Sequence, residues 1–129
     1  MPSVYIFEAQ ELFGPELERL ASLAGGRVCA RSAVLDLDAI ITAAPDVVLL
    51  DLDYTTYDVL DVLGVLRDEA PAIRPVVLSA ERARGWIARC RAAGAAAVVS
   101  KTVSEYDLVH DLRVIFDGGT VWDVRVEAG

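Results

Sequence analysis

At 129 residues the chain has the usual length of one domain, and it can bury a hydrophobic core without disulfides or metal ions. Hydrophobic residues make up 54% of the sequence, yet charged residues, Pro or Gly interrupt each apolar run well before the ~18 residues of a membrane-spanning helix. The formal net charge of −8 argues against direct binding of this domain to nucleic acid phosphates. We therefore expect a cytoplasmic domain that contacts neither nucleic acid nor membrane directly.

Short apolar segments alternate with segments in which apolar residues recur at helical spacing. In chain order we predict strand 4–7, helix 12–23, strand 27–30, helix 35–43, strand 47–50, helix 59–66, strand 75–78, helix 86–90, strand 97–100 and helix 108–115. Continuously apolar strands that alternate with helices predict an α/β fold, a parallel sheet covered on both faces. Residues 1–120 form the predicted domain, and residues 121–129 form a tail or the start of a linker.

Smaller features add to this prediction. Ser104 stands three residues before Asp107, a pattern typical of the start of a helix. Cys29 and Cys90 lie in apolar surroundings without metal-binding spacing, and we expect both to be buried free thiols of a reducing compartment.

Polar side chains follow four of the predicted strands. The segment PDVVLLDLDYTT places Asp51 at the end of the third strand, and Glu8, Ser79 and Lys101 end the first, fourth and fifth. Functional groups of an open parallel sheet gather beyond the carboxyl ends of its strands, so we expect these four side chains to converge.

This set of residues suits phosphoryl transfer. The Asp51 carboxylate can attack phosphorus to form an acyl phosphate, while Lys101 and the Ser79 hydroxyl offset charge on the phosphoryl oxygens. Glu8 and Asp51 together, with a backbone carbonyl, are ligands that Mg²⁺ prefers.

The blocks PDVVLLDLD, VVLSA, RAAGAAAVVSK and SEYDLVHDLRVIFDGGTVW resemble the receiver domains of bacterial two-component response regulators, especially those linked to helix-turn-helix output domains. The resemblance implies that Asp51 is the phosphoacceptor, Ser79 the switch hydroxyl and Lys101 the partner lysine. It also implies that Glu8, Asp51 and the backbone carbonyl of Asp53 hold Mg²⁺.

The same resemblance implies a flavodoxin-like (CheY-like) sheet in the order 2-1-3-4-5 with five helices. It further implies a histidine kinase as phosphoryl donor, self-phosphorylation at most in place of enzyme turnover, and signalling through the surface of the fourth and fifth helices. A homodimer and a helix-turn-helix output domain in a longer chain, which would regulate transcription, are its expected assemblies.

Three positions depart from the family pattern. Ala9 replaces the second acidic residue of the metal site, Tyr54-Thr55 replaces the frequent Met-Pro, and Val98 replaces the aromatic switch residue. These departures predict weaker Mg²⁺ binding, and they leave open a phosphorylation-independent interaction module.

A third interpretation rests on VVLLDLDYT, which is similar to the first motif of haloacid-dehalogenase-like phosphatases. There Asp51 would be the nucleophile and Asp53 the general acid, with Ser79 and Lys101 as later motifs. The chain lacks the further pair of acids after the lysine that this family uses for Mg²⁺, so this remains a remote alternative.

Overall fold

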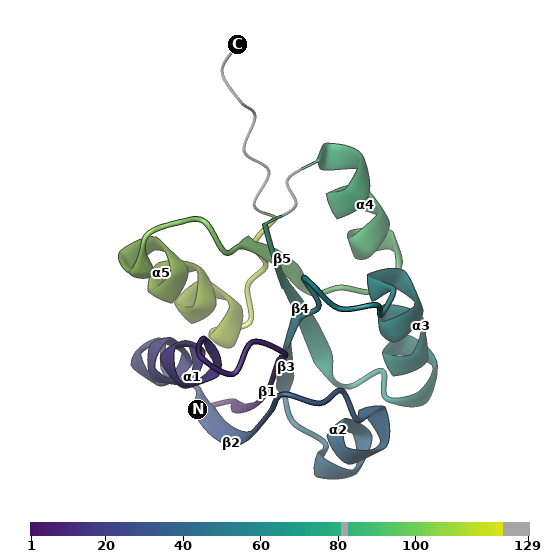
Figure 1. The fold of residues 1–129 in the computed structure, drawn as a ribbon, viewed down its shortest axis with the longest axis horizontal. Helices are drawn as coiled ribbons and strands as arrows, with labels where there is room; N and C mark the ends of the chain where they lie inside the picture. The colour runs from purple at the N-terminus through teal and green to yellow at the C-terminus, as the bar shows by residue number, and fades with distance from the viewer. Residues whose placement is uncertain (81–82, 123–129) are drawn as a thin grey trace.

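The computed structural model describes residues 1–80 and 83–122, which form one five-stranded sheet (Figure 1). The strand order is β2-β1-β3-β4-β5 and every pairing is parallel, which confirms the predicted topology. The strands are β1 (Ser3–Glu8), β2 (Arg27–Ser32), β3 (Val47–Asp51), β4 (Arg74–Ser79) and β5 (Ala97–Ser100).

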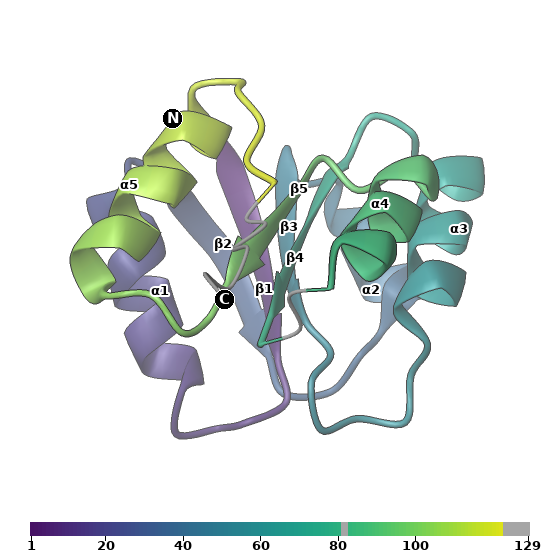
Figure 2. The same ribbon diagram turned by 90° about the horizontal axis from the view of Figure 1, so that it is seen from above.

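Helices cover both faces of the sheet. On one face lie α1 (Gly14–Leu23) and α5 (Glu105–Phe116), and on the other lie α2 (Leu37–Ala43), α3 (Val59–Glu69) and α4 (Arg84–Ala92) (Figure 2).

The two faces explain why the strands are apolar throughout. Along β3, Val47 and Leu49 belong to the core beneath α1 and α5, whereas Val48 and Leu50 belong to the core beneath the other three helices. Successive side chains of a strand point to opposite faces, so a strand covered on both sides needs apolar residues at every position.

Side-chain caps begin three of the helices. Asp36 accepts a hydrogen bond from the Ala39 N–H at 3.0 Å at the start of α2, and Asp58 accepts one from the Leu60 N–H at 2.8 Å at the start of α3. Ser104 accepts a hydrogen bond from the Asp107 N–H at 3.1 Å, which confirms the cap predicted for α5.

Two local expectations are wrong. Leu12 lies in the turn before α1 and is 98% exposed, because the helix begins only at Gly14, with Pro15 in its first turn. Cys90 is buried as expected, but Cys29 is exposed. The β1–β2 register skips Cys29 at an irregularity between Val4 and Tyr5, so this residue occupies a bulge in an edge strand.

The chain that follows α5 is tied to the sheet. The Arg74 guanidinium donates hydrogen bonds to the Ile115 carbonyl at 2.7 Å and the Gly119 carbonyl at 2.6 Å. The Val98 N–H donates to the Val121 carbonyl at 2.9 Å, so residues 121 and 122 lie along β5. The rest of the predicted tail, 123–129, lies outside the described residues.

None of the helices in the described part of the chain is both long enough and apolar enough to span a bilayer.

Gly26 allows a close approach between the α1–β2 turn and the core. A Cβ atom there would lie 2.8 Å from Phe116 Cε2 and 2.9 Å from Val4 Cγ2. We predict that Gly26→Ala lowers the free energy of unfolding by about 1–3 kcal/mol in urea denaturation, because the core must shift.

Gly64 is the matched control, because it lies within α3 and its Cβ would meet nothing within 4 Å. Gly64→Ala should stabilise the protein by about 1 kcal/mol through its higher helix propensity. Equal effects of the two substitutions would contradict this account of the packing at Gly26.

Candidate functional site

The register of the sheet brings the four predicted residues to one edge. Glu8 pairs with Asp51 across β1 and β3, and Ser79 pairs with Ser100, the residue before Lys101, across β4 and β5. Glu8, Asp51 and Ser79 are buried, with exposed fractions of 2%, 0% and 3%. The convergence expected at the strand ends is therefore present in the structure.

The Asp51 carboxylate is held from two sides. Its Oδ2 atom lies 2.5 Å from Lys101 Nζ, and its Oδ1 atom accepts a hydrogen bond from the Asp53 N–H at 3.1 Å. The Lys101 N–H in turn donates to the Ser79 carbonyl at 3.1 Å, which fixes the backbone from which the lysine side chain extends.

The Asp53 side chain receives donors that the sequence did not reveal. The Ser79 hydroxyl donates to Asp53 Oδ1 at 2.8 Å, and the Ala80 N–H donates to Asp53 Oδ2 at 2.9 Å. Lys101 Nζ lies 3.6 Å from the same Oδ2 atom. The resemblance to receiver domains gave a role only to the backbone carbonyl of Asp53, yet its carboxylate joins the end of β3 to the end of β4.

Glu8 is a buried acid with few donors around it. Its Oε1 atom accepts a hydrogen bond from the Gln10 N–H at 2.9 Å. Burial first, and then the neighbouring Asp51 carboxylate, raise the pKa of Glu8 from its ordinary 4.5 to about 8. Within the described residues, neither Glu8 Oε2 nor Asp51 Oδ2 has a partner of ordinary hydrogen-bond geometry, although the latter faces the Lys101 ammonium.

Lys101 stays charged despite its half-buried position. Burial lowers its pKa, but the hydrogen bond and charge of Asp51, together with the charges of Asp53 and Glu8, outweigh burial and raise it above its usual value. Two aromatic rings flank the ammonium, with centroids 5.7 Å away for Phe13 and 5.9 Å away for Tyr54.

Tyr54 adopts an unusual backbone conformation next to the site. Its φ of 62° lies in the left-handed region, which a bulky residue seldom enters. The Thr55 hydroxyl donates to the Leu52 carbonyl at 2.7 Å and stabilises this turn. Such local strain is typical of functional loops, and apolar periodicity gave no signal for it.

The donor set fits a small hard cation in part. Glu8 and Asp51 offer two neighbouring buried carboxylates, of which only Asp51 already faces a cation, the Lys101 ammonium. Asp53 contributes a backbone carbonyl. Ala9 adds only a methyl group. In the described part of the chain no group of three acidic, His or Cys side chains is arranged to hold a metal. Mg²⁺ commonly takes one or two carboxylates and completes its shell with water, so the residues present fit it.

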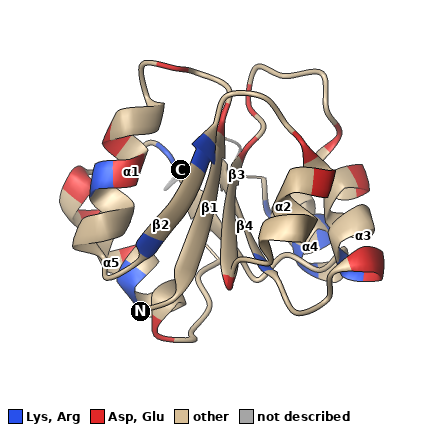
Figure 3. Cartoon of the chain, turned by 90° about the horizontal axis from the view of Figure 1, so that it is seen from below, with Lys and Arg blue, Asp and Glu red and all other residues tan. Residues whose placement is uncertain are grey.

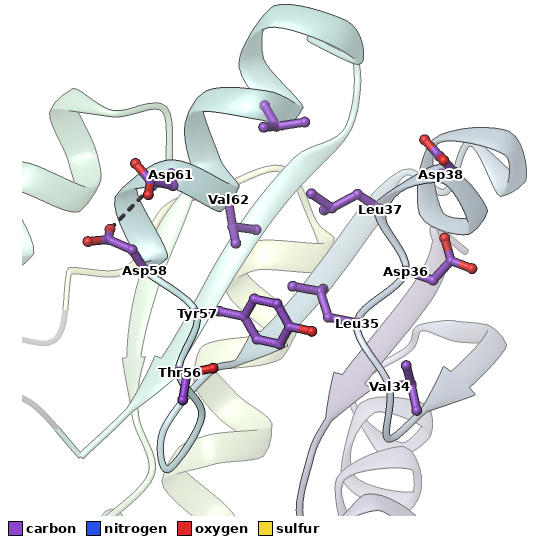
Figure 4. A pocket seen from close by; sticks show the side chains of 11 residues that line it. Val34, Leu35, Asp36, Leu37, Asp38, Thr56, Tyr57, Asp58, Asp61 and Val62 are labelled. Carbon is purple, nitrogen blue, oxygen red and sulfur yellow. Dashed lines mark hydrogen bonds between the residues drawn. The ribbon is translucent and has the colours of Figure 1, made fainter.

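A separate depression of about 640 Å³ lies between the loops that lead into α2 and α3 (Figure 4). The ring of Tyr57 lies beside Leu35 in it, and its rim carries four acids, Asp36, Asp38, Asp58 and Asp61. Figure 3 shows this acidic colouring at the starts of α2 and α3, and basic residues on β2. None of the predicted site residues lines this depression.

Comparisons with known proteins agree with the predicted family. No protein-family model matches the chain. The transcriptional regulatory protein MctR of Rhizobium johnstonii is 33% identical over 82 residues, which cover 64% of this chain and 38% of MctR. The chain thus matches well under half the length of that relative.

Two solved structures are similar over most of the chain. A LuxR family DNA-binding response regulator from Silicibacter pomeroyi is 25% identical, with a TM-score of 0.76 over 94% of this chain and 96% of that one. A DNA-binding response regulator of the LuxR family from Staphylococcus aureus is also 25% identical, with a TM-score of 0.71 over 85% and 94% of the two chains. Together with the strand order and the residues at the strand ends, these likenesses show that the chain is a receiver domain of the two-component response regulator family.

Proposed function

We propose that this receiver domain accepts a phosphoryl group on Asp51 from a histidine kinase, and that phosphorylation changes the surface formed by α4 and α5. The observation that carries the proposal is the position of Asp51, a fully buried carboxylate 2.5 Å from Lys101 Nζ at the end of the central strand. Ser79 stands at the end of the adjacent strand.

The transfer needs little covalent chemistry from the protein. An oxygen of Asp51 forms a bond to phosphorus while the bond from phosphorus to the donor nitrogen of phosphohistidine breaks, and the histidine leaves with the electron pair. The Lys101 ammonium and the Ser79 hydroxyl then stabilise charge on the phosphoryl oxygens. The chain is on this account a phosphoacceptor and not an enzyme with turnover of its own.

Glu8, Asp51 and the Asp53 carbonyl would hold Mg²⁺. The ion supplies positive charge that offsets repulsion between the carboxylates and the incoming phosphoryl group. Since the pKa of Glu8 is about 8, metal binding must remove a proton from it near neutral pH. This competition, together with the methyl group of Ala9, accounts for the weak Mg²⁺ binding that we propose.

The output lies outside this domain. MctR is named a transcriptional regulatory protein, and the S. pomeroyi and S. aureus proteins are named DNA-binding response regulators. We propose that residues 1–120 are the receiver unit, that 121–129 begin a linker, and that a helix-turn-helix domain in a longer chain carries the DNA contact. Self-association of two receiver domains is a second route to the output.

One observation favours a phosphorylation-independent module as the competing function. The Asp53 carboxylate already binds the Ser79 hydroxyl and the Ala80 N–H, so the residues at the end of β4 are held in place without phosphate. The same contacts argue against the phosphatase alternative, because Asp53 accepts two hydrogen bonds where a general acid would donate a proton.

The contact between α4 and the end of the described chain suggests how a signal leaves the site. The Arg91 guanidinium lies over the Trp122 ring, 5.0 Å from its centroid, and Trp122 packs into the same core as Val98. Trp122 therefore brings an aromatic ring to the neighbourhood where the family pattern has one at position 98.

We predict that Mg²⁺ and acetyl phosphate add one phosphoryl group to the protein, detectable by intact mass spectrometry. Asp51→Asn should abolish the adduct, and Lys101→Gln should slow its formation about 100-fold because the phosphoryl charge loses its cation. Asp68→Asn is the matched control, since Asp68 is exposed near the end of α3. An unlabelled wild-type protein, under conditions that label another receiver, would refute the phosphoacceptor assignment.

The raised pKa of Glu8 predicts a pH-dependent stability in metal-free buffer. The folded protein retains the Glu8 proton up to about pH 8, whereas the unfolded chain loses it near pH 4.5. The corresponding stabilisation is complete below about pH 4.5 and disappears as the pH rises to about 8. Urea denaturation across this range should show the free energy of unfolding of the wild type falling relative to that of Glu8→Gln. If the free energy of unfolding changed with pH in the same way in the two proteins, the raised pKa of Glu8 would be contradicted.

Phosphorylation should also change the environment of Trp122. In a Trp86→Phe background, in which Trp122 is the remaining tryptophan, acetyl phosphate with Mg²⁺ should shift the emission maximum because α4 carries Arg91 away from the ring. The same treatment of the variant that also carries Asp51→Asn should leave the spectrum unchanged. If the phosphoryl adduct forms but the emission maximum of Trp122 stays the same, the proposed displacement of α4 would be excluded.

A further inference from the structure

We propose that the Asp53 carboxylate is an internal anion that occupies the binding site of the phosphoryl oxygens. In this arrangement it holds Ser79, the Ala80 N–H and Lys101 in the positions that a phosphoryl group would require, and it must withdraw when Asp51 is phosphorylated. The second half of the proposal rests on the proposed function of Asp51, whereas the first half stands on the contacts of Asp53 alone.

Three donors from two strand ends meet at this one carboxylate. The Ser79 hydroxyl and the Ala80 N–H bind different oxygens of Asp53, at 2.8 Å and 2.9 Å, and the Lys101 ammonium lies 3.6 Å from the second oxygen. A hydroxyl, a backbone amide and a cation are the donors that proteins direct at phosphate oxygens. Here an aspartate of the protein itself fills that arrangement.

The same donors surround Asp51, where the phosphoryl group would form. Lys101 Nζ lies 2.5 Å from Asp51 Oδ2 and so serves both carboxylates. The Asp51–Leu78 pairing places Ser79, the last residue of β4, and the following Ala80 next to the end of β3. A phosphoryl group on Asp51 therefore competes with the Asp53 side chain for these donors. The two anions would also repel each other, because both lie beside the same Lys101 ammonium.

Asp53 is able to withdraw without disrupting the site. Its side chain is 23% exposed, whereas that of Asp51 is fully buried. The Asp53 N–H binds Asp51 Oδ1 through the backbone, so a rotation about the Asp53 side chain leaves this hydrogen bond in place. The side chain would then point to solvent, where its charge is stabilised by water.

Two consequences follow for signalling. Phosphorylation must displace an anion that already satisfies the donors, so it is slower than in a variant that lacks the Asp53 charge. Ser79 and Ala80 at the end of β4 are also partly in their phosphate-bound arrangement at rest, because the Asp53 carboxylate already binds both residues. The difference between the two states at Ser79 and Ala80 is correspondingly small.

The test compares the wild type with Asp53→Asn, Asp53→Ala and the control Asp68→Asn, after circular dichroism has shown that each variant folds. The first readout is hydrogen exchange at the Ala80 amide by NMR, without any phosphodonor. The second is the rate of adduct formation with acetyl phosphate and Mg²⁺, followed by intact mass spectrometry. The third is Ala80 exchange after addition of beryllofluoride with Mg²⁺.

We expect Ala80 exchange to rise about tenfold or more in Asp53→Ala, because a hydrogen bond to a charged acceptor is lost. Asp53→Asn, which keeps the shape but not the charge, should lie between that variant and the wild type. Adduct formation should be several-fold faster in both variants. Beryllofluoride should restore Ala80 protection in Asp53→Ala and change it little in the wild type.

Unchanged Ala80 exchange in Asp53→Ala would overturn the internal-anion proposal. Equal rates of adduct formation in the wild type and both variants would overturn the competition with phosphoryl. If no protein forms an adduct while Ala80 exchange rises in Asp53→Ala, the phosphoacceptor function fails, but the role of Asp53 as the resident anion is supported. These outcomes separate the inference from the function on which its second half rests.

Discussion

The burial of neighbouring carboxylates at one edge of the sheet governs the site. Glu8 and Asp51 face each other across β1 and β3 and are almost fully removed from water, and Asp53 stands beside them. Buried charges persist only when partners offset their desolvation. The Lys101 ammonium offsets one charge, backbone and hydroxyl donors stabilise Asp53, and the raised pKa of Glu8 allows a proton to neutralise the third.

This charge balance explains the effect of having alanine, and not a second acid, at position 9. A second acid at that position would hold Mg²⁺ more tightly, but without the ion it would add another uncompensated charge to a buried cluster. With alanine, the cluster reaches a stable balance through the proton on Glu8 and the donors around Asp53. Alanine at this position thus favours a resting state that is ordered without metal. On the function proposed above, both Mg²⁺ and a phosphoryl group would compete with groups that the protein already provides.

Much of the fold and part of the site follow from local patterns in the sequence. Apolar runs located the five strands, and strand ends placed Glu8, Asp51, Ser79 and Lys101 at one edge because parallel strands share a direction. Features that depend on the pairing between strands were inaccessible. The bulge at Cys29 is a property of the β1–β2 register, and the contacts of the Asp53 carboxylate depend on how the loop after β3 folds against the end of β4. Neither feature changes the spacing of apolar residues in the sequence, so the sequence pattern could not predict it.

The link from the buried acids to the surface runs through one short connection. Ala80 contributes an N–H to the Asp53 carboxylate, and the chain then leads toward α4, whose Arg91 lies over Trp122. Trp122 is held beside β5 because the Val98 N–H binds the Val121 carbonyl. On the proposed function, a change of the anion at Ser79 and Ala80 would act on α4, the next helix in the chain. Arg91 of that helix contacts Trp122 at the end of the described residues. Displacement of α4 is therefore the simplest motion that would couple the site to the segment after Trp122.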